Sequence, residues 1–202
     1  MQRVIVTGGA GFIGSHLVDK LIKQGIEVIV FDDLSVGNID NINPKAKICN
    51  YVDTCNLGTF VKADFKGVDT IFHLAALTSV QESIEQPLIY NQNNVDGILN
   101  ILTAASSIDS VKRVVFSSSS SVYGDVKTPT SENHPLDPLS PYALSKLIGE
   151  QHCKLFSKIY DLDTVCLRYF NVYGDRMNNE GYKLVFPIFK EQMLNNKPLT
   201  IN

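Results

Sequence analysis

The sequence predicts an α/β fold, a doubly wound parallel sheet covered by helices on both faces. Short apolar runs alternate along the chain with segments whose apolar residues recur at helical spacing. Such an alternation is typical of parallel strands joined by crossover helices. A glycine-rich turn at residues 7–14 also joins the first apolar run directly to the first helical segment, which is the strand–turn–helix unit of this fold class.

Six apolar runs are predicted to form the strands of the sheet. They are Val4–Val6, Glu27–Phe31, Lys47–Tyr51, Thr70–His73, Arg113–Ser117 and Thr164–Leu167. The segments with helical patterns are Ile13–Gln24, Leu57–Asp64, Leu88–Ser106 and Tyr142–Tyr160. Four prolines between Lys127 and Pro141 predict a loop that leads into the last of these helices.

Composition and charge argue against several classes of partner. The 202 residues carry a net charge of −3, which gives no indication of nucleic acid or an anionic membrane as a partner. The four cysteines and four histidines lack metal-ligand spacing, so we expect reduced thiols and no metal site. No apolar run approaches the roughly 18 residues of a membrane span, and the chain enters a strand without a signal peptide, so we expect a cytoplasmic protein.

The glycine turn predicts a dinucleotide site. Gly9, Gly11 and Gly14 satisfy G-x-G-x-x-G directly after a strand, and Gly8 offers a second register. Glycines let backbone N–H groups approach a pyrophosphate, and the N-terminus of the following helix adds partial positive charge. One alternative is a tight turn without a ligand. A P-loop is excluded because Ser15 follows Gly14 where a Lys is required.

Asp32 closes the second predicted strand, 18 residues after Gly14. A carboxylate at that place accepts both hydroxyls of an adenine ribose and repels a 2′-phosphate. No Arg follows between Asp33 and Gly37, so the sequence favours NAD over NADP as the cofactor. The alternative is that Asp32 only caps a loop or helix, as Asp often does.

Tyr142 and Lys146 form a second candidate site. Positions i and i+4 share one face of a helix, so we expect the phenol and the ammonium to lie side by side. A nearby cation lowers the pKa of a tyrosine and makes it usable as a base near neutral pH. Tyr123 and Lys127 have the same spacing, but Gly124 argues against a helix there. For the spacing alone, an exposed helix pair is the better explanation; the dinucleotide turn upstream favours catalysis.

A serine run, Ser117–Ser121, begins where the Arg113–Ser117 strand ends. Open α/β sheets bind ligands at the carboxyl edge of their strands. A hydroxyl at that edge could hold a substrate oxygen and relay its proton. The alternative is that several of these serines only cap the loop, and composition does not distinguish between them.

Six short segments follow one another in a recognisable order. They are Thr7–Gly14 (T-G-G-A-G-F-I-G), His73–Ala76 (H-L-A-A), Asn94–Gly97 (N-V-D-G), Ser118–Gly124 (S-S-S-S-V-Y-G), Tyr142–Lys146 (Y-A-L-S-K) and Arg168–Asn171 (R-Y-F-N). In this order they resemble the motifs of the extended short-chain dehydrogenase/reductase family, in its nucleotide-sugar epimerase/dehydratase branch. The resemblance extends over nearly the whole chain and implies a Rossmann-type NAD-binding domain.

The resemblance implies a role for each matching residue. Tyr142 would be the base, Lys146 would hold the nicotinamide ribose, and Ser119 would touch the reacting oxygen of the substrate. Asn171 would bind the diphosphate of the substrate. The residues implied around the cofactor are Gly8, Gly11, Phe12, Ile13 and Gly14 at the pyrophosphate, Asp32 at the ribose, Asp53 at the adenine, Leu74, Ala75, Ala76 and Asn94 along the cofactor, and Phe170 by the nicotinamide.

The resemblance also bears on the reaction. Dehydratases of the family place an Asp-Glu pair directly after the catalytic hydroxyl, where this chain has Ser120 and Ser121. A hydroxyl is too weak an acid to eliminate water near neutral pH. The resemblance therefore implies epimerisation at C4 of a nucleotide-linked hexose, a UDP-sugar, through a transient 4-keto intermediate. The alternatives are an NAD-binding module without turnover, a dehydratase or oxidoreductase of the same family, and an oxidoreductase for a free small alcohol.

The end of the chain suggests a second, incomplete domain. The pattern loosens after Arg168, with a helix expected at Tyr182–Leu194 and the start of a strand at Pro198–Ile201. We expect residues 1–174 to form the NAD-binding domain with the catalytic residues, and residues 175–202 to begin a truncated substrate-binding domain. The resemblance further implies a homodimer through the Leu88–Ser106 and Tyr142–Tyr160 helices. The alternative is that these helices only cover the sheet.

Overall fold

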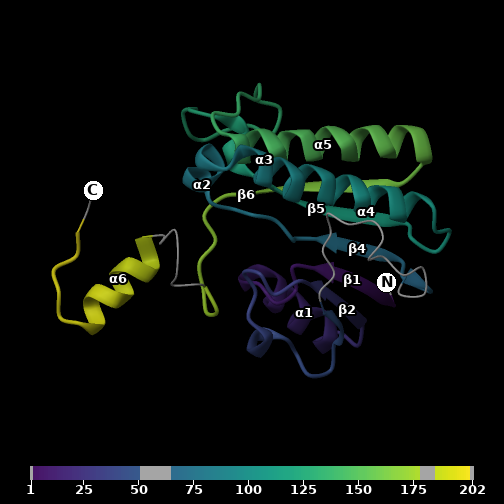
Figure 1. The fold of residues 1–202 in the computed structure, drawn as a ribbon, viewed down its shortest axis with the longest axis horizontal. Coiled ribbons are helices and arrows are strands. Elements are labelled where there is room, and N and C mark those ends of the chain that lie inside the picture. The colour runs from purple at the N-terminus through teal and green to yellow at the C-terminus, as the bar shows by residue number, and fades with distance from the viewer. Residues whose placement is uncertain (1, 51–64, 178–184, 201–202) are drawn as a thin grey trace. The chain divides into compact units, whose positions relative to one another are not determined.

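A single parallel sheet of six strands organises the chain, in the order β3-β2-β1-β4-β5-β6 (Figure 1). The computed structural model describes residues 2–50, 65–177 and 185–200. The order reverses between β1 and β4, which is the switch point where doubly wound sheets bind ligands. The predicted fold class is therefore confirmed. The strands are β1 (Arg3–Thr7), β2 (Glu27–Asp32), β3 (Lys47–Asn50), β4 (Thr70–His73), β5 (Arg113–Ser119) and β6 (Asp163–Tyr169).

Helices cover both faces of the sheet (Figure 1). Helix α1 (Phe12–Lys23) lies on one face, and α4 (Gly97–Ser106) and α5 (Pro141–Tyr160) lie on the other. Alternate residues of β1 point to opposite faces of the sheet. Val4 and Val6 pack in the hydrophobic cluster that includes residues of α1, whereas Ile5 packs in the cluster that includes residues of α4 and α5. The uninterrupted apolar strands of the sequence reflect this burial on both faces.

The pairing registers bring the strand ends to one edge. Thr7 at the end of β1 pairs with Phe31 on one side and with His73 on the other. His73 in turn pairs with Phe116 of β5. The glycine turn, the segment after β4 and the serine run therefore all begin at the same edge of the sheet.

Some elements differ from the sequence prediction. The helix expected at residues 88–106 is divided into α3 (Pro87–Asn91), a π-helical turn at Gln92–Asp96, and α4. A short helix α2 (Val80–Glu85) was not predicted, although the Ser79 hydroxyl caps it by accepting from the Glu82 N–H. The predicted helix Leu57–Asp64 lies outside the described residues.

The chain divides into two compact units, residues 1–170 and residues 171–202. The second unit contains α6 (Val185–Leu194), within the helix expected there. Residues 198–200 form no strand, contrary to expectation, and Ile201 lies outside the described residues. The Thr200 N–H donates to Gln192 of α6, and the Thr200 hydroxyl accepts from the Gln192 side-chain amide. Within the described residues no helix is long and apolar enough to cross a membrane.

Candidate active site

The glycine turn leaves room at its centre only for backbone. Gly8 has a φ of +69°, which favours glycine, and its N–H donates to the Phe31 carbonyl over 2.8 Å. A Cβ atom at Gly14 would lie 2.1 Å from the Gly8 carbonyl oxygen, so the first turn of α1 packs directly on the turn before it. Gly11 precedes α1 and has no side chain to cap its N-terminus. This geometry fits a pyrophosphate.

Asp32 is buried at the end of β2 and anchors the glycine turn. Its two carboxylate oxygens accept the N–H groups of Ala10 and Leu34, each over 2.9 Å. Burial raises the pKa of Asp32 above its ordinary value, and these two hydrogen bonds oppose that rise. A carboxylate oxygen accepts more than one hydrogen bond, so the capping role and a ribose-binding role are compatible.

Thr7 and His73 form a buried link that sequence reasoning missed. The Thr7 hydroxyl accepts the N–H groups of Leu74 and Ala75, each over 3.1 Å, and lies 2.8 Å from His73 Nδ1. With both its lone pairs used, the hydroxyl donates its proton to Nδ1. Burial lowers the pKa of His73 to about 3, so the ring is neutral and can accept that proton. The link fixes the segment 74–76 at the edge of the sheet.

Lys146 is a buried cation beneath that edge. The residue is only 4% exposed, and its Nζ donates to the Ser117 carbonyl over 3.0 Å. The Nζ lies 5.2 Å from the centre of the Phe116 ring and 5.9 Å from the centre of the Tyr142 ring. Burial lowers the pKa of Lys146 from 10.5 to about 8.

Tyr142 stands in the first turn of α5 and is paired with Ser119. The helix begins at Pro141, and the Ser140 hydroxyl caps it by accepting the Ala143 N–H over 3.1 Å. Burial raises the pKa of Tyr142, and a hydrogen bond from the Ser119 hydroxyl opposes that rise. The expected lowering of this pKa by Lys146 is wrong for this structure, because desolvation of the phenol dominates.

The Ser119 hydroxyl is oriented by its neighbour. It accepts the N–H of Ser121 over 3.2 Å and the hydroxyl proton of Ser121 over 2.8 Å. Its own proton is then available for Tyr142. The competing pair Tyr123 and Lys127 shares no helix, since a 3₁₀ turn ends at Tyr123, as the sequence predicts.

Asn94 lies in the π-helical turn and connects two parts of the site. Its side-chain amide donates to the Leu77 carbonyl and to the Ser145 hydroxyl, each over 3.0 Å, and its oxygen accepts the Leu77 N–H over 2.9 Å. It thereby joins the segment after β4 to α5 beside Lys146. An interruption of this kind in a helix is frequent at functional sites.

The remaining predicted residues occupy varied places. Phe12 and Ile13 form the first turn of α1 and, like Ala75 and Ala76, are half-buried. Phe170 ends the first unit with an exposed ring whose centre lies 6.4 Å from that of Tyr123. Asn171 belongs to the second unit, and Asp53 lies outside the described residues.

Residues 4–202 match the NAD dependent epimerase/dehydratase family. The chain belongs to this family. The family is NAD dependent, which agrees with the NAD cofactor expected from the sequence. The predicted resemblance is thereby confirmed, since the match to the family extends over nearly the whole chain.

Individual relatives of the family are similar over almost all of this chain. A putative UDP-glucose 4-epimerase of Methanocaldococcus jannaschii is 45% identical over 96% of the chain and 64% of its own length. The Thermotoga maritima UDP-glucose 4-epimerase with UDP-glucose has a TM-score of 0.91 at 38% identity, over 97% of this chain and 64% of that one. The Thermus thermophilus UDP-glucose 4-epimerase in complex with NAD has a TM-score of 0.89 at 37% identity, over 98% and 64%. The chain therefore spans less than two thirds of the length of these relatives.

Proposed function

We propose that this chain forms the NAD-binding and catalytic part of a 4-epimerase for a nucleotide-linked hexose, a UDP-sugar. The observation that carries the proposal is the placement of Tyr142 beside the buried Lys146, whose Nζ lies 5.9 Å from the centre of the Tyr142 ring, with the Ser119 hydroxyl acting on the pKa of the phenol. This pair lies at the same sheet edge as the glycine turn. The UDP-glucose 4-epimerases among its relatives support the substrate class.

The residues around the glycine turn fit NAD. We propose that Gly8, Gly11 and Gly14 admit the pyrophosphate. Side chains at Gly8 and Gly14 would collide with backbone, and a Cβ at Gly11 would lie 3.2 Å from the Gly8 carbonyl oxygen. The remaining proposed contacts are Phe12 and Ile13 at the pyrophosphate, Asp32 at the adenosine ribose, Asp53 at the adenine, Leu74, Ala75, Ala76 and Asn94 along the cofactor, and Lys146 and Phe170 near the nicotinamide. When bound, NAD supplies a reversible hydride acceptor for C4 of the sugar.

The chain's own residues handle the proton. Ser119 would hold the C4 hydroxyl oxygen, and Tyr142 would take its proton as a transient 4-keto sugar forms, then return it. Lys146, a buried cation whose Nζ donates to the Ser117 carbonyl, would hold the nicotinamide ribose. Asn171 would bind the diphosphate of the substrate. The sugar would then stay anchored while its 4-keto form turns to present the opposite face to the hydride.

The neighbours of Ser119 favour epimerisation over dehydration. Ser121 donates its hydroxyl proton to Ser119 over 2.8 Å, and Ser120 is also an alcohol. Elimination of water needs an acid and a base of suitable pKa at the site, which two alcohols do not provide near neutral pH.

The direct test is incubation of the protein with NAD and UDP-glucose while UDP-galactose is followed by NMR. We expect interconversion that Tyr142→Phe abolishes and that Ser119→Ala slows by about 10²–10⁴-fold. Lys127→Met, which changes the other Tyr-x-x-x-Lys pair, should leave the rate unchanged. No conversion of UDP-glucose or of its N-acetyl and uronic acid analogues would refute the proposed epimerase.

A second candidate function is an NAD-binding module without turnover of its own. It requires only the glycine turn and Asp32, which are joined by the hydrogen bond from the Ala10 N–H to the Asp32 carboxylate. Calorimetry distinguishes the two, because the module predicts stoichiometric NAD binding without conversion of any nucleotide sugar. We propose the same division as the sequence suggests, with residues 1–174 binding NAD and residues 175–202 beginning a substrate domain, in a homodimeric cytoplasmic protein.

A further inference from the structure

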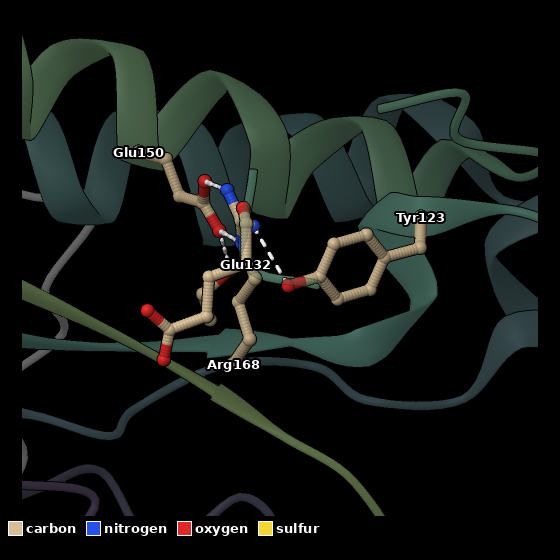
Figure 2. A network of polar contacts seen from close by, with 5 residues as sticks. Tyr123, Glu132, Glu150 and Arg168 are labelled. Carbon is tan, nitrogen blue, oxygen red and sulfur yellow. Dashed lines mark hydrogen bonds and ion pairs between the residues drawn. The ribbon is translucent and has the colours of Figure 1, made fainter. Parts of the chain in front are cut away.

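Glu150 is a buried carboxylate that the proposed chemistry does not use. It lies on α5, one helical turn beyond Lys146 and two beyond Tyr142, and is 8% exposed. Arg168 of β6 meets it at two points, with Nε donating to Oε1 over 2.9 Å and Nη2 donating to Oε2 over 2.7 Å. Figure 2 shows the guanidinium facing the carboxylate.

This ion pair holds both ends of the segment that contains Ser119. At one end, the Ser118 hydroxyl donates to Glu150 Oε1 over 2.5 Å. At the other end, Arg168 Nη1 donates to the Tyr123 hydroxyl oxygen over 2.8 Å, a contact visible in Figure 2. Ser119 lies between these two anchors and has little freedom to shift along or away from the sheet.

Arg168 also reaches the loop that precedes α5. Its Nη1 donates to the Glu132 carbonyl over 2.8 Å, and its guanidinium carbon lies 4.8 Å from the centre of the Tyr123 ring. The same loop ends at Ser140, which caps α5 just before Tyr142. One ion pair therefore connects the elements that carry Ser119 with those that carry Tyr142.

The Glu150–Arg168 ion pair holds a fixed geometry. A two-point contact between guanidinium and carboxylate fixes orientation as well as distance, which a lysine would not do. Hydrogen bonds to Glu150 raise the pKa of Arg168 above its ordinary value, so the guanidinium stays charged across the physiological range. A carboxylate so deeply buried is costly to leave unpaired, and the pair is therefore held closed.

We propose that Glu150 and Arg168 are positioning residues that hold the Ser119 hydroxyl in its place beside Tyr142. The catalytic meaning of this inference rests on the proposed function. The placement of Ser119 that it predicts does not depend on turnover and is measured separately.

The chain offers a matched control at the other end of the same two strands. Arg113 begins β5 and Asp163 begins β6, and Arg113 Nε donates to Asp163 Oδ2 over 2.6 Å. Both side chains are about half exposed, and the pair lies at the opposite edge of the sheet from Ser119. Asp163→Asn therefore loosens the β5–β6 pairing without touching the candidate site.

The test follows the hydroxyl-bearing ring carbon of Tyr142 by NMR in the 202-residue chain with ¹³C-labelled tyrosine at neutral pH. Tyr142→Phe identifies the signal, and Ser119→Ala gives the change that loss of the hydrogen bond produces. We expect Glu150→Gln to move the signal in the same direction, Asp163→Asn to leave it in place, and Glu150→Gln added to Ser119→Ala to move it no further.

If the Glu150→Gln variant does not fold, Ser118→Ala provides the test. This substitution leaves the Glu150–Arg168 ion pair intact and removes only the hydrogen bond from Ser118 of β5 to Glu150. We expect a smaller change in the same direction. An unchanged Tyr142 signal in the folded variants, or additive changes in the double variant, would overturn the inference.

Kinetics provide the second readout. We expect Glu150→Gln to lower kcat by about ten- to a hundredfold with KM unchanged, and Asp163→Asn to leave both constants at the wild-type values. A change confined to KM would contradict a positioning role. Inactivity of the wild-type protein would refute the epimerase proposal alone, since the NMR signal still decides the placement of Ser119.

Discussion

Two buried residues at the candidate site are held in electrostatic states that cost stability. Lys146 donates from its Nζ to the Ser117 carbonyl, yet burial depresses its pKa to about 8. Asp32 is also buried, and its pKa is raised even though two backbone N–H groups donate to it. Such strained ionisation is typical of sites where function rather than stability determines the residue.

Replacing the buried cation should stabilise the protein. Between pH 8 and 10.5 the unfolded chain holds the Lys146 proton more tightly than the folded chain does, so this residue makes stability rise with pH across that window. Lys146→Met should therefore raise the free energy of unfolding near neutral pH by about 1–3 kcal/mol and remove that rise. Urea unfolding at several pH values measures both effects. Lys154→Met, an exposed change on the same helix, is the control, and a less stable Lys146→Met would contradict the prediction.

Asp32 should decide cofactor affinity and choice. We expect Asp32→Asn to weaken NAD binding by about ten- to a hundredfold, because hydrogen bonds to a charged acceptor are lost. Discrimination against NADP should fall as well, since the carboxylate no longer repels a 2′-phosphate. Calorimetric titration with both dinucleotides measures this. Asp33→Asn, an exposed neighbour, should bind like the wild type. Equal NAD affinity in Asp32→Asn would exclude a ribose-binding role.

At the scale of elements, α5 is held against the sheet by the close packing of one glycine and by hydrogen bonds of two charged side chains. Gly149 lies directly against the Phe116 ring, Lys146 bonds to β5, and Glu150 bonds to β5 and β6. The sequence predicts this helix and its start after Pro141 correctly, because its pattern and cap are local. It does not reveal the contact with Phe116, since the two residues are brought together only by packing across the sheet.

Gly149→Ala should destabilise the protein, against its helix propensity. In an exposed helix this change stabilises by about 1 kcal/mol. Here the new Cβ would lie 2.5 Å from Phe116 Cζ, and the buried ring has nowhere to move, so we expect a loss of about 1–3 kcal/mol. Thermal unfolding measures the loss. Combining Gly149→Ala with Phe116→Leu should recover part of the lost stability. A Gly149→Ala variant more stable than the wild type would contradict the prediction and show that α5 can shift.

At the scale of the molecule, an apolar surface remains on the helices of the first unit. Leu88 of α3 is 84% exposed, and Leu144, Leu155 and Ile159 of α5 are also exposed. The α3 and α5 helices pack against each other, so these side chains belong to neighbouring elements. Apolar side chains gathered in this way are frequently covered in an assembly, which supports the homodimer expected from the resemblance.

The dimer is tested by sedimentation at micromolar concentration. We expect a dimer that Leu88→Glu together with Ile159→Glu converts to a monomer, because charges in an apolar interface are left without solvent or partner. Val36→Glu, at another exposed apolar residue, should leave the dimer intact. A wild-type monomer would mean that these helices only cover the sheet.

Local patterns in the sequence were enough to predict the glycine turn, Asp32, the serine run and the Tyr142–Lys146 pair. In each of these, a few neighbouring residues specify a turn, a strand end or a helix face. How the distant parts meet follows only from the packed fold. The Thr7–His73 link, the interrupted helix around Asn94 and the Glu150–Arg168 pair depend on register between strands that are far apart in sequence. The raised pKa of Tyr142 also escapes a prediction from local sequence, because the burial that raises it arises from the whole fold.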